Sequence, residues 1–394
     1  MIVRPPRKED DQQIYEVSRL AFGGSREPAP GELWSDQQGW HGLVAELDGR
    51  VAGTLKVRDY RQYFGGVAVP MGGVANVAVL PAARGHGVAN ALIDAILPEM
   101  RDRGQCVSAL YPSVPPLYRG RGWEQTGNYE RVTLRPEYFT MLPRPSQRLP
   151  MRRATDDDLP ALHDCYRRFA RTVDGMLDRA TDAFRPEKVL DLDIVDVVPG
   201  RDGTVLGFLT GERPDGDQLI VHDLVAADRE TVLSLFANLA RWAGIITDIS
   251  LRIDDPAWWQ LIAPQPVLHD VRNHPWMLRV VDLPAAVGAR GWPVATHLAD
   301  TAVDIEVADE HAPWQSGSHR LVVEGGKVRC EPGGGGNGTG TVRLHARALG
   351  PWFAGSADTA MLRRTGLLEG DPTAARVLDV LTGAPRLPRM ADSF

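Results

Sequence analysis

Cysteine, basic charge and uninterrupted apolar runs are scarce in this sequence, and each scarcity excludes a class of protein. The cysteines form no CxxC pair and offer neither a disulfide framework nor a zinc site; they are Cys106, Cys165 and Cys330. The longest apolar stretch, 67–83, contains two prolines and an asparagine and is too short to span a bilayer. The first ten residues become charged before an apolar run develops, unlike a signal peptide. We therefore expect a cytoplasmic protein with no membrane partner.

The charge balance argues against a second class. The chain has 51 Asp and Glu against 44 Lys and Arg, a net charge of −7. Nucleic-acid binding favours a basic face, so we expect no nucleic-acid partner. A negative field mildly favours a cationic small substrate. The ten histidines include no HExxH pattern, and we expect no metal.

The first part of the 394-residue chain alternates between helical and strand patterns. Residues 10–22 have apolar side chains at helical spacing, and residues 88–103 predict a helix that Gly104 ends. Asp48-Gly49 is a hairpin signal between two strand-like segments. Strands are predicted over 42–47, 51–57, 67–69, 74–79 and 107–111. The result is a mixed α/β domain.

After a linker rich in proline and arginine, residues 142–150, the same pattern begins again. Residues 151–159 repeat the order of residues 2–10: a strand, a turn and an acidic helix start. Strands over 205–211 and 218–225 and a helix over 229–243 follow. We interpret this part as a degenerate second copy of the first fold.

The character changes once more after residue 284. Strands are predicted over 302–307 and 318–323, and a helix over 373–381. The glycine run 333–338 is interpreted as a turn and not as a phosphate loop, because neither a strand-to-helix context nor Lys-Ser/Thr follows it. We expect three domains, residues 1–145, 146–284 and 285–394.

The most informative segment fits the pattern [Q/R]-x-x-G-x-[G/A], directly after a strand and at a helix start. Its residues are Arg84, Gly85, His86, Gly87, Val88 and Ala89. The first N–H groups of a helix have no intrahelical partner and, with the helix dipole, form an anion site that suits a pyrophosphate. Glycine lets a ligand approach the backbone. The alternatives are an ordinary glycine-rich helix start and a Rossmann fingerprint, which fits worse because it needs three glycines and a later acid.

A second pattern, Y-x-x-x-G-[aromatic], occurs at Tyr118, Gly122 and Trp123. In this order and spacing, the two patterns resemble the pyrophosphate-binding and following motifs of the GNAT acetyltransferase superfamily. The resemblance implies that residues 84–89 hold the pyrophosphate of coenzyme A (CoA). It also implies that the pantetheine lies along the preceding strand, at Val77, Ala78 and Val79.

The same resemblance assigns two catalytic roles. The Val79 N–H would stabilise the tetrahedral oxyanion. Tyr118 would protonate the leaving thiolate, since a thiol pKa of about 8.5 and a tyrosine pKa of about 10 are close enough for proton transfer. The alternative for Tyr118 is a core tyrosine that packs against Trp123.

Over its whole length the chain resembles the Eis family of acetyltransferases. The likeness rests on Ser113, five residues before Tyr118, and on residues 221–226, 277–286 and 388–394. It implies an α/β fold: tandem GNAT-like mixed α/β domains and a C-terminal α+β domain of sterol-carrier-protein type. A homo-oligomer, a hexamer in the family, is also implied.

The family likeness implies further site residues. Ser113 would contact the coenzyme, and Phe22 and Trp34 would border the substrate, although core packing is an equal alternative for Trp34. The α-carboxylate of Phe394 would help to take up the proton of the amine; a disordered tail is the alternative. Ser393 stands where the family often has an acidic residue, and residues 23–27 also differ, so the aminoglycoside preference of the family is in question.

These patterns predict an acyl-CoA-dependent N-acyltransferase. It would move an acetyl or other acyl group from acyl-CoA to a primary amine in a ternary complex, with acetyl-CoA as co-substrate. The acceptor would be a small molecule, such as an aminoglycoside-like antibiotic, polyamine, lysine or biosynthetic intermediate. The rival function is a non-catalytic acyl-CoA or lipid-binding protein.

Overall fold

The structure of the chain, a computed structural model, describes residues 1–37, 39–181, 184–214, 216–263, 271–333, 340–383 and 386–394. All but the first residue of the predicted glycine turn, 333–338, lie outside the described residues. The chain divides into two units, each made of segments that are distant in the sequence. Unit 1 is Met1–Thr126, Trp276–Pro388 and Phe394, and unit 2 is Gly127–Pro275 and Arg389–Ser393.

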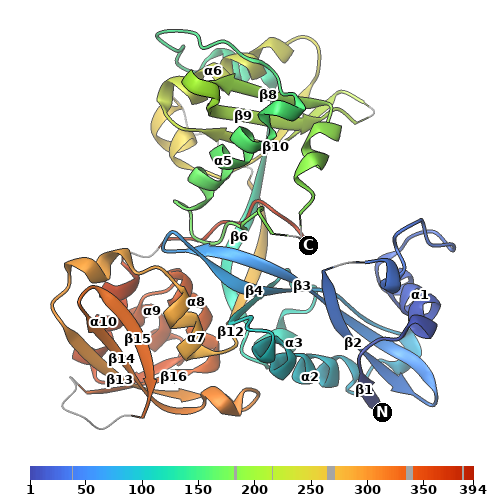
Figure 1. Ribbon diagram of the computed structural model, residues 1–394, viewed down its shortest axis with the longest axis vertical. Helices are drawn as coiled ribbons and strands as arrows, with labels where there is room; N and C mark the ends of the chain where they lie inside the picture. Colours follow the sequence, from blue (N-terminus) through green and yellow to red (C-terminus); the bar gives the residue numbers. More distant parts are fainter. Residues whose placement is uncertain (38, 182–183, 215, 264–270, 334–339, 384–385) are drawn as a thin grey trace. The chain divides into compact units, whose positions relative to one another are not determined.

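The first sheet of unit 1 contains the hairpin that the sequence predicts (Figure 1). Asp48 and Gly49 have φ values of 49° and 76°, as a two-residue hairpin turn requires. The strands are β1 (Ile2–Arg4), β2 (Trp40–Leu47), β3 (Arg50–Phe64), β4 (Val67–Val79) and β5 (Val107–Leu110). Each pairs with the next, and only β4 and β5 are parallel. Residues 277–280 of β12 (Val271–Val280) pair with the other side of β5.

Two helices bury opposite faces of this sheet. α1 (Asp11–Phe22) contributes Ile14 and Val17 to a core cluster with Val44 of β2. α2 (Val88–Asp102) contributes Leu92 to a different cluster with Leu43. Adjacent strand residues point to opposite faces, so one strand serves both cores. A short helix, α3 (Pro115–Arg119), follows β5.

The C-terminal part of unit 1 forms a second sheet, in the order β15-β14-β13-β16-β17. Its strands are β13 (Thr301–Ala308), β14 (Gly317–Glu324), β15 (Lys327–Pro332), β16 (Thr341–His345) and β17 (Leu368–Gly370). Its helices are α7 (Leu283–Ala289), α8 (Ala346–Ala354), α9 (Thr359–Arg364) and α10 (Pro372–Thr382). The predicted strands at 302–307 and 318–323 and the predicted helix at 373–381 are confirmed.

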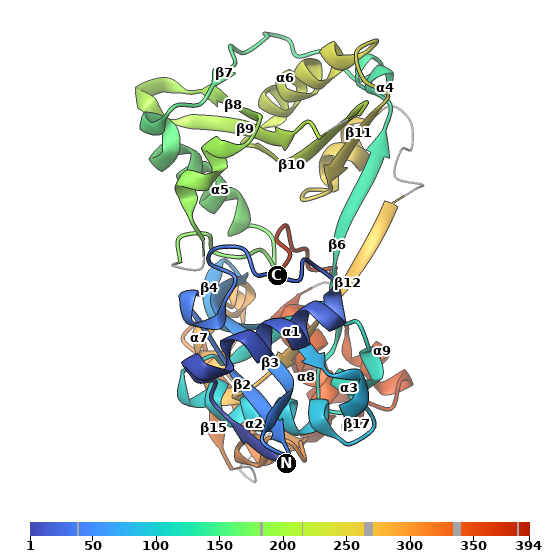
Figure 2. The ribbon, with the colours of Figure 1, turned by 90° about the vertical axis from the view of Figure 1, so that its right-hand side faces the viewer.

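Unit 2 repeats the topology of the first sheet. Its order is β7-β8-β9-β10-β11-β6, and only β10 and β11 are parallel. The strands are β6 (Glu124–Leu134), β7 (Arg152–Arg153), β8 (Ile194–Pro199), β9 (Val205–Glu212), β10 (Gln218–Ala226) and β11 (Asp248–Arg252). The helices α5 (Leu159–Ala170) and α6 (Arg229–Leu239) lie on opposite faces of β8, β9 and β10 (Figure 2). A short helix, α4 (Pro136–Thr140), follows β6.

The start of each copy is fixed by the same ion pair. Arg4 donates both terminal nitrogens to the carboxylate of Asp10, at 2.6 and 2.9 Å. Arg152 holds Asp158 in the same way, at 2.6 and 2.8 Å. In both copies the acid lies six residues after the arginine and directly before the main helix. The predicted second copy is therefore confirmed in topology and in local detail.

Three predicted boundaries are wrong. The strand expected over 51–57 continues to Phe64 as β3. The strands expected over 67–69 and 74–79 are one strand, β4, because its ladder with β3 continues past Pro70, which pairs opposite Arg61. The helix expected over 229–243 ends at Leu239 and continues as a 3₁₀ turn, Ala240–Trp242. None of these boundaries has a local signal in the sequence.

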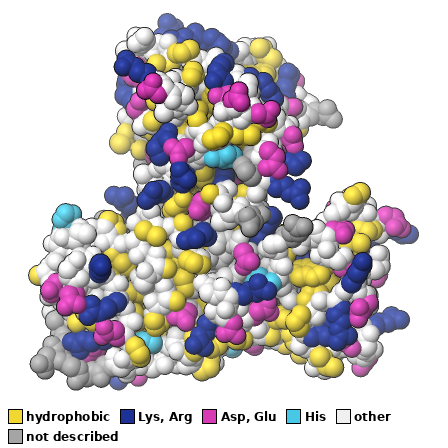
Figure 3. Space-filling model, viewed as in Figure 1, with side chains coloured by type: hydrophobic (Ala, Val, Ile, Leu, Met, Phe, Trp, Pro, Cys, Tyr) yellow, Lys and Arg dark blue, Asp and Glu magenta, His cyan; other side chains and the backbone are white. Residues whose placement is uncertain are grey.

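On the face drawn in Figure 3, Lys and Arg side chains are interspersed with Asp and Glu, so this face has no large patch of a single charge sign. No helix within the described ranges is long and apolar enough to cross a membrane. The three cysteines are buried and unpaired.

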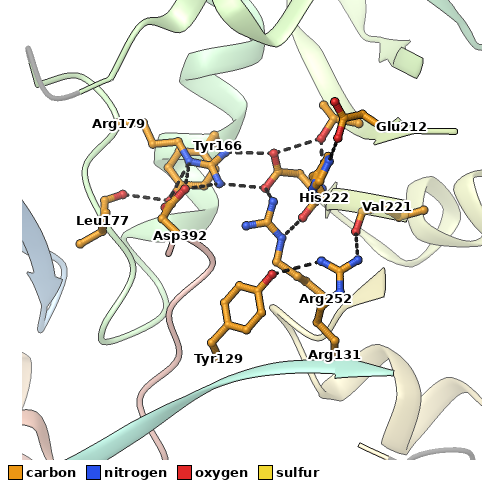
Figure 4. A network of polar contacts seen from close by, with 12 residues as sticks. Tyr129, Arg131, Tyr166, Leu177, Arg179, Glu212, Val221, His222, Arg252 and Asp392 are labelled. Carbon is orange, nitrogen blue, oxygen red and sulfur yellow. Dashed lines mark hydrogen bonds and ion pairs between the residues drawn. The ribbon is translucent and has the colours of Figure 1, made fainter. Parts of the chain in front are cut away.

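Unit 2 contains a cluster of buried and half-buried charges (Figure 4). Arg179 donates to both carboxylate oxygens of Asp223, at 3.0 and 2.9 Å, and also pairs with Asp392. Arg252 lies 3.5 Å from Asp223. Asp254 is also buried, and desolvation raises its pKa to about 7 although Arg252 opposes the shift.

We expect the stability of unit 2 to fall as pH rises because of Asp254. Its pKa is higher in the folded chain than its usual 3.8. Its contribution is therefore fully present below about pH 4 and is lost as pH rises through about 7. Asp254→Asn keeps the neutral form, so its advantage in melting temperature over wild type should grow between pH 5 and pH 8, by at least about 2–4 °C. A constant difference measured by calorimetry at the two pH values would contradict this assignment.

Candidate functional site

β4 and β5 separate in the middle of the first sheet. They pair only at residues 71–73 of β4 and 107–109 of β5, whereas β4 continues beside β3 to Val79. Beyond Gly73, the side of β4 that faces away from β3 has no strand partner among the described residues. The separation leaves a row of backbone groups available to a ligand.

The backbone of Val79 points into this separation. The Leu80 N–H donates to the Ala52 carbonyl of β3, at 2.9 Å. Successive strand residues direct their backbone groups to alternate sides, so the N–H of Val79 points away from β3 and that of Ala78 toward it. The backbone N–H of Val77 has the same orientation as that of Val79. A bulge lies just before Val77, at Asn76, which has a φ of 48° and accepts a hydrogen bond from Ser18 at 2.9 Å.

The loop before α2 presents unpaired N–H groups. Gly85 and Gly87 have φ values of 81° and 76° and no atom where a Cβ would stand, so the backbone is open to an approaching ligand. Within the described residues, the N–H groups of residues 85–90 have no acceptor. A hollow of about 280 Å³ lies here, and it is lined by Val79, Ala83, Arg84, Gly85, Gly87, Val88, Ala89 and Asn90. This arrangement suits an anion at a helix N-terminus.

The second copy contrasts with this loop. Asp228 caps α6, and its carboxylate accepts a hydrogen bond from the Thr231 N–H at 2.8 Å. The helix start is therefore occupied by the chain's own negative charge. The Asp228 carboxylate takes up the Thr231 N–H, and its negative charge makes the local field unfavourable for a pyrophosphate.

Tyr118 lies on α3 and is 7% exposed. Its ring packs edge-on against Trp123 at a centroid distance of 6.4 Å. Its hydroxyl has no hydrogen-bond partner within the part of the chain that the structure describes. Burial raises the pKa of Tyr118 to about 12, above the value of about 10 expected from residue type. The hydroxyl therefore stays protonated at neutral pH, and burial makes it a weaker acid than the pKa of about 10 used in the sequence prediction implies.

Phe394 lies where β4 and β5 separate. Its ring contacts Tyr60 of β3 and Tyr111 after β5, with centroid distances of 5.0 and 5.7 Å. Gly73, the last β4 residue paired with β5, leaves the room that this ring occupies, since a Cβ there would stand 3.0 Å from Phe394 Cε2. The last residue of the chain is thus placed beside the backbone groups described above.

The five residues before Phe394 are held firmly in unit 2. Arg389 forms an ion pair with Glu130 and donates its backbone N–H to the Asp174 carbonyl at 2.9 Å. Asp392 pairs with Arg179 at 3.0 Å, and the Arg179 guanidinium lies over Tyr166, 4.0 Å from its centroid (Figure 4). The predicted ending is therefore a fixed segment, and its acid is Asp392 rather than the residue beside Phe394.

The two predicted substrate-side aromatics differ in burial. Phe22 ends α1 and is 59% exposed. Trp34 is half-buried and packs against the core beneath α1. The Lys56 ammonium lies 5.7 Å from the Trp34 ring and donates to Gln37 at 3.2 Å. Lys56 is 6% exposed, and desolvation lowers its pKa.

The remaining predicted residues lie at the surface. Ser113 is exposed in the loop before α3. His86 is exposed, and its Nδ1 lies 3.0 Å from the Arg84 carbonyl. No group of three or more potential metal ligands occurs among the described residues.

Sequence reasoning missed several residues of this region. Gly73 had a signal, since the pair Gly72-Gly73 inside a strand marks a close backbone approach. Arg279 had one as well, because it is a charge inside an apolar strand. Tyr60 had no signal in the sequence, because the residue that its ring contacts, Phe394, lies at the far end of the chain.

Comparison with known proteins agrees with this geometry. Residues 2–126 match the acetyltransferase (GNAT) domain family. Residues 283–391 match the sterol carrier protein domain family. Both matches lie almost wholly within unit 1.

Relatives match over most of the chain. An uncharacterized N-acetyltransferase of Streptomyces avermitilis is 27% identical over 363 residues, 83% of this chain and 84% of that protein. The GCN5-related N-acetyltransferase of Kribbella flavida is 27% identical with a TM-score of 0.81, and 100% of each chain is covered. The Eis1 protein of Mycobacterium abscessus shares the fold at 22% identity, with a TM-score of 0.74 and full coverage of both chains.

We expect Gly87→Val to weaken CoA binding about tenfold or more. A branched residue in the left-handed conformation costs about 1–2 kcal/mol, and 1.4 kcal/mol is a factor of ten in affinity. Titration calorimetry with CoA measures the effect, and Ala82→Val at an exposed position of the preceding turn is the matched control. Equal affinities of the two variants would contradict an anion site at this loop.

Proposed function

We propose that this chain, which matches a GNAT acetyltransferase domain and a C-terminal sterol carrier protein domain, is an Eis-like N-acetyltransferase that transfers an acetyl group from acetyl-CoA directly to a primary amine of a small molecule. The observation that supports the proposal most is the separation of β4 and β5 after Gly73, with the uncapped start of α2 at one end and Phe394 at the other. Acyl transfer needs these three elements: a donor groove, an anion cradle and a nearby proton acceptor.

In this proposal the donor lies along β4. The free N–H groups of residues 85–90 hold its pyrophosphate, with Arg84 adding positive charge. Its pantetheine amides pair with the backbone of Val77 and Val79, as a further strand would. Ser113 contributes a hydroxyl, and Ala78, whose backbone faces β3, holds the strand in register.

The amine then attacks the carbonyl carbon of the thioester. The Val79 N–H stabilises the oxyanion that forms, in a site with little water. When the C–S bond breaks, the thiolate takes the proton of Tyr118, and the C–N bond of the amide is complete. The amine nitrogen, which is protonated at neutral pH because its pKa is about 10.4, loses two protons overall. One leaves through water to the Phe394 carboxylate before the attack, and the other returns to the Tyr118 oxygen after it and restores the acid.

The acceptor is a small-molecule amine that approaches from the side of Phe22 and Trp34. Aminoglycosides, polyamines, lysine and biosynthetic intermediates are all candidate classes. The proposal also includes three domains (1–145, 146–284 and 285–394) and a cytoplasmic location. It further includes a homo-oligomer, whose mass can be measured by light scattering after size-exclusion chromatography.

The rival function is a non-catalytic acyl-CoA or lipid-binding protein. Thiol release from acetyl-CoA over a panel of aminoglycosides, polyamines, lysine peptides and simple amines separates the two functions. Amine-dependent release is expected. Release that stays at background with acetyl-CoA and with longer acyl-CoAs, together with tight CoA binding, would favour the binding protein.

Replacing the proposed acid should slow chemistry without affecting the donor site. Tyr118→Phe is expected to lower kcat about 10²-fold or more. CoA affinity and melting temperature should stay unchanged, since the ring and its contact with Trp123 remain. Tyr138→Phe is the matched control, because that buried hydroxyl, on α4 of unit 2, also has no hydrogen-bond partner among the residues that the structure describes. Unchanged turnover in Tyr118→Phe would remove Tyr118 as the acid.

Moving the terminal carboxylate tests the other catalytic group. A short Gly-Ser extension after Phe394 should abolish most of the turnover, because the carboxylate is displaced from the separation of β4 and β5. The melting temperature should stay near that of wild type. The same extension before Met1, which is exposed, is the control. A fully active C-terminal extension would refute the role of the carboxylate.

A further inference from the structure

The residues directly after Tyr118 fold back onto its own backbone. The N–H groups of Arg121 and Trp123 both donate to the Tyr118 carbonyl, at 2.9 and 3.2 Å. The position of the Tyr118 side chain therefore depends on where this turn, residues 119–123, is held. We call it the Tyr118 turn.

A buried arginine from β12 holds the Tyr118 turn. Arg279 is 1% exposed, and its Nη1 donates to the Arg121 carbonyl. Its guanidinium carbon lies 5.3 Å from the centroid of the Trp123 ring. One side chain thus contacts the two residues whose N–H groups bind the Tyr118 carbonyl.

The glycine of the Y-x-x-x-G pattern makes room for this arginine. A Cβ on Gly122 would overlap Arg279 Nη1. Gly122 also has a φ of 86°, which favours glycine. The motif residue next to Trp123 is therefore explained by a contact with a residue more than 150 positions later in the chain.

Arg279 is itself fixed by the sterol carrier protein domain. Its Nη2 donates to both carboxylate oxygens of Asp309, at 3.0 and 2.8 Å. Asp309 also accepts hydrogen bonds from the Ala312 N–H at 3.0 Å and from Gln315 Nε2 at 2.7 Å. The carboxylate is thus locked in its own domain, where it holds Nη2 of the guanidinium while Nη1 reaches the Arg121 carbonyl.

Two further polar contacts run from the same domain to the same turn. Arg347 of α8 donates to Glu124 at 2.7 Å, and Glu124 accepts from Arg119 at 2.8 Å. His311 lies 2.9 Å from Asp94 of α2, which accepts from the Arg121 side chain at 2.8 Å. The first and the middle residue of the Tyr118 turn, Arg119 and Arg121, are therefore both held.

A buried ion pair is weak support for stability, because apolar residues of the same volume often stabilise a fold as well or better. Its clearest physical effect is to fix geometry. We propose that Arg279, oriented by Asp309, is a positioning residue for Tyr118, so that the sterol carrier protein domain helps to aim the proposed acid. This inference rests on the proposed function.

The test uses the paired variant R279M/D309N, which leaves no buried charge without a partner, in the wild-type and Y118F backgrounds. In the wild-type background kcat is expected to fall about 10²-fold, the cost of a misplaced catalytic group, while the KM for acetyl-CoA stays unchanged. In the Y118F background no further fall is expected, because the proton that Arg279 helps to aim is absent. The matched control is R320M/D304N, an ion pair of the same domain that lies between β13 and β14.

Unchanged kcat in the paired variant, or an equal fall in both backgrounds, would overturn the proposal. R279K is the second variant, and it answers the same question if the pair fails to fold. A lysine keeps the charge opposite Asp309 but lacks the planar fork that also reaches the Arg121 carbonyl. It should lower kcat while keeping the melting temperature.

Hydrogen exchange separates failure of this inference from failure of the proposed function. Amide exchange in residues 118–123 should be faster in R279M/D309N than in wild type and unchanged in R320M/D304N. This readout needs no substrate, so it applies even if no amine is acetylated. Equal exchange in wild type and R279M/D309N would overturn the positioning role.

Discussion

The arrangement of the site depends on one constraint: β4 and β5 share only three paired positions and then separate at Gly73. A strand that loses its neighbour exposes a row of backbone donors and acceptors, which is costly unless water or a ligand satisfies them. β4 keeps its ladder with β3 beyond Gly73 as far as Val79, so the separation is a fixed feature of the sheet. The uncapped start of α2 directly after β4 adds an anion site to the same edge.

Elements from distant parts of the chain complete this region. β12 supplies the strand beside β5 and carries Arg279, while the last residue, Phe394, fills the space that Gly73 leaves. In unit 2 the same topology has no such site, because Asp228 occupies its helix start. The same fold thus occurs twice. In the first copy the N–H groups at the start of α2 are available to a ligand, whereas in the second copy Asp228 caps the start of α6.

Local features of the fold and site were predictable from the sequence, and non-local ones were not. The Asp48-Gly49 hairpin, the loop at Gly85 and Gly87 and the second copy each have a signal within ten residues, and all are found. The continuity of β4 through Pro70 depends on β3, and the role of Gly122 depends on Arg279. The pKa of Tyr118 could not be foreseen either, because it depends on burial by residues far along the chain.

The most direct test of the account is a crystal structure of the protein with CoA bound. The account predicts that the pyrophosphate accepts hydrogen bonds from the N–H groups of residues 85–90. The pantetheine should extend along Val77 and Val79, with its sulfur within reach of the Tyr118 hydroxyl. A CoA molecule bound elsewhere, with the edge of β4 beyond Gly73 left free, would contradict it.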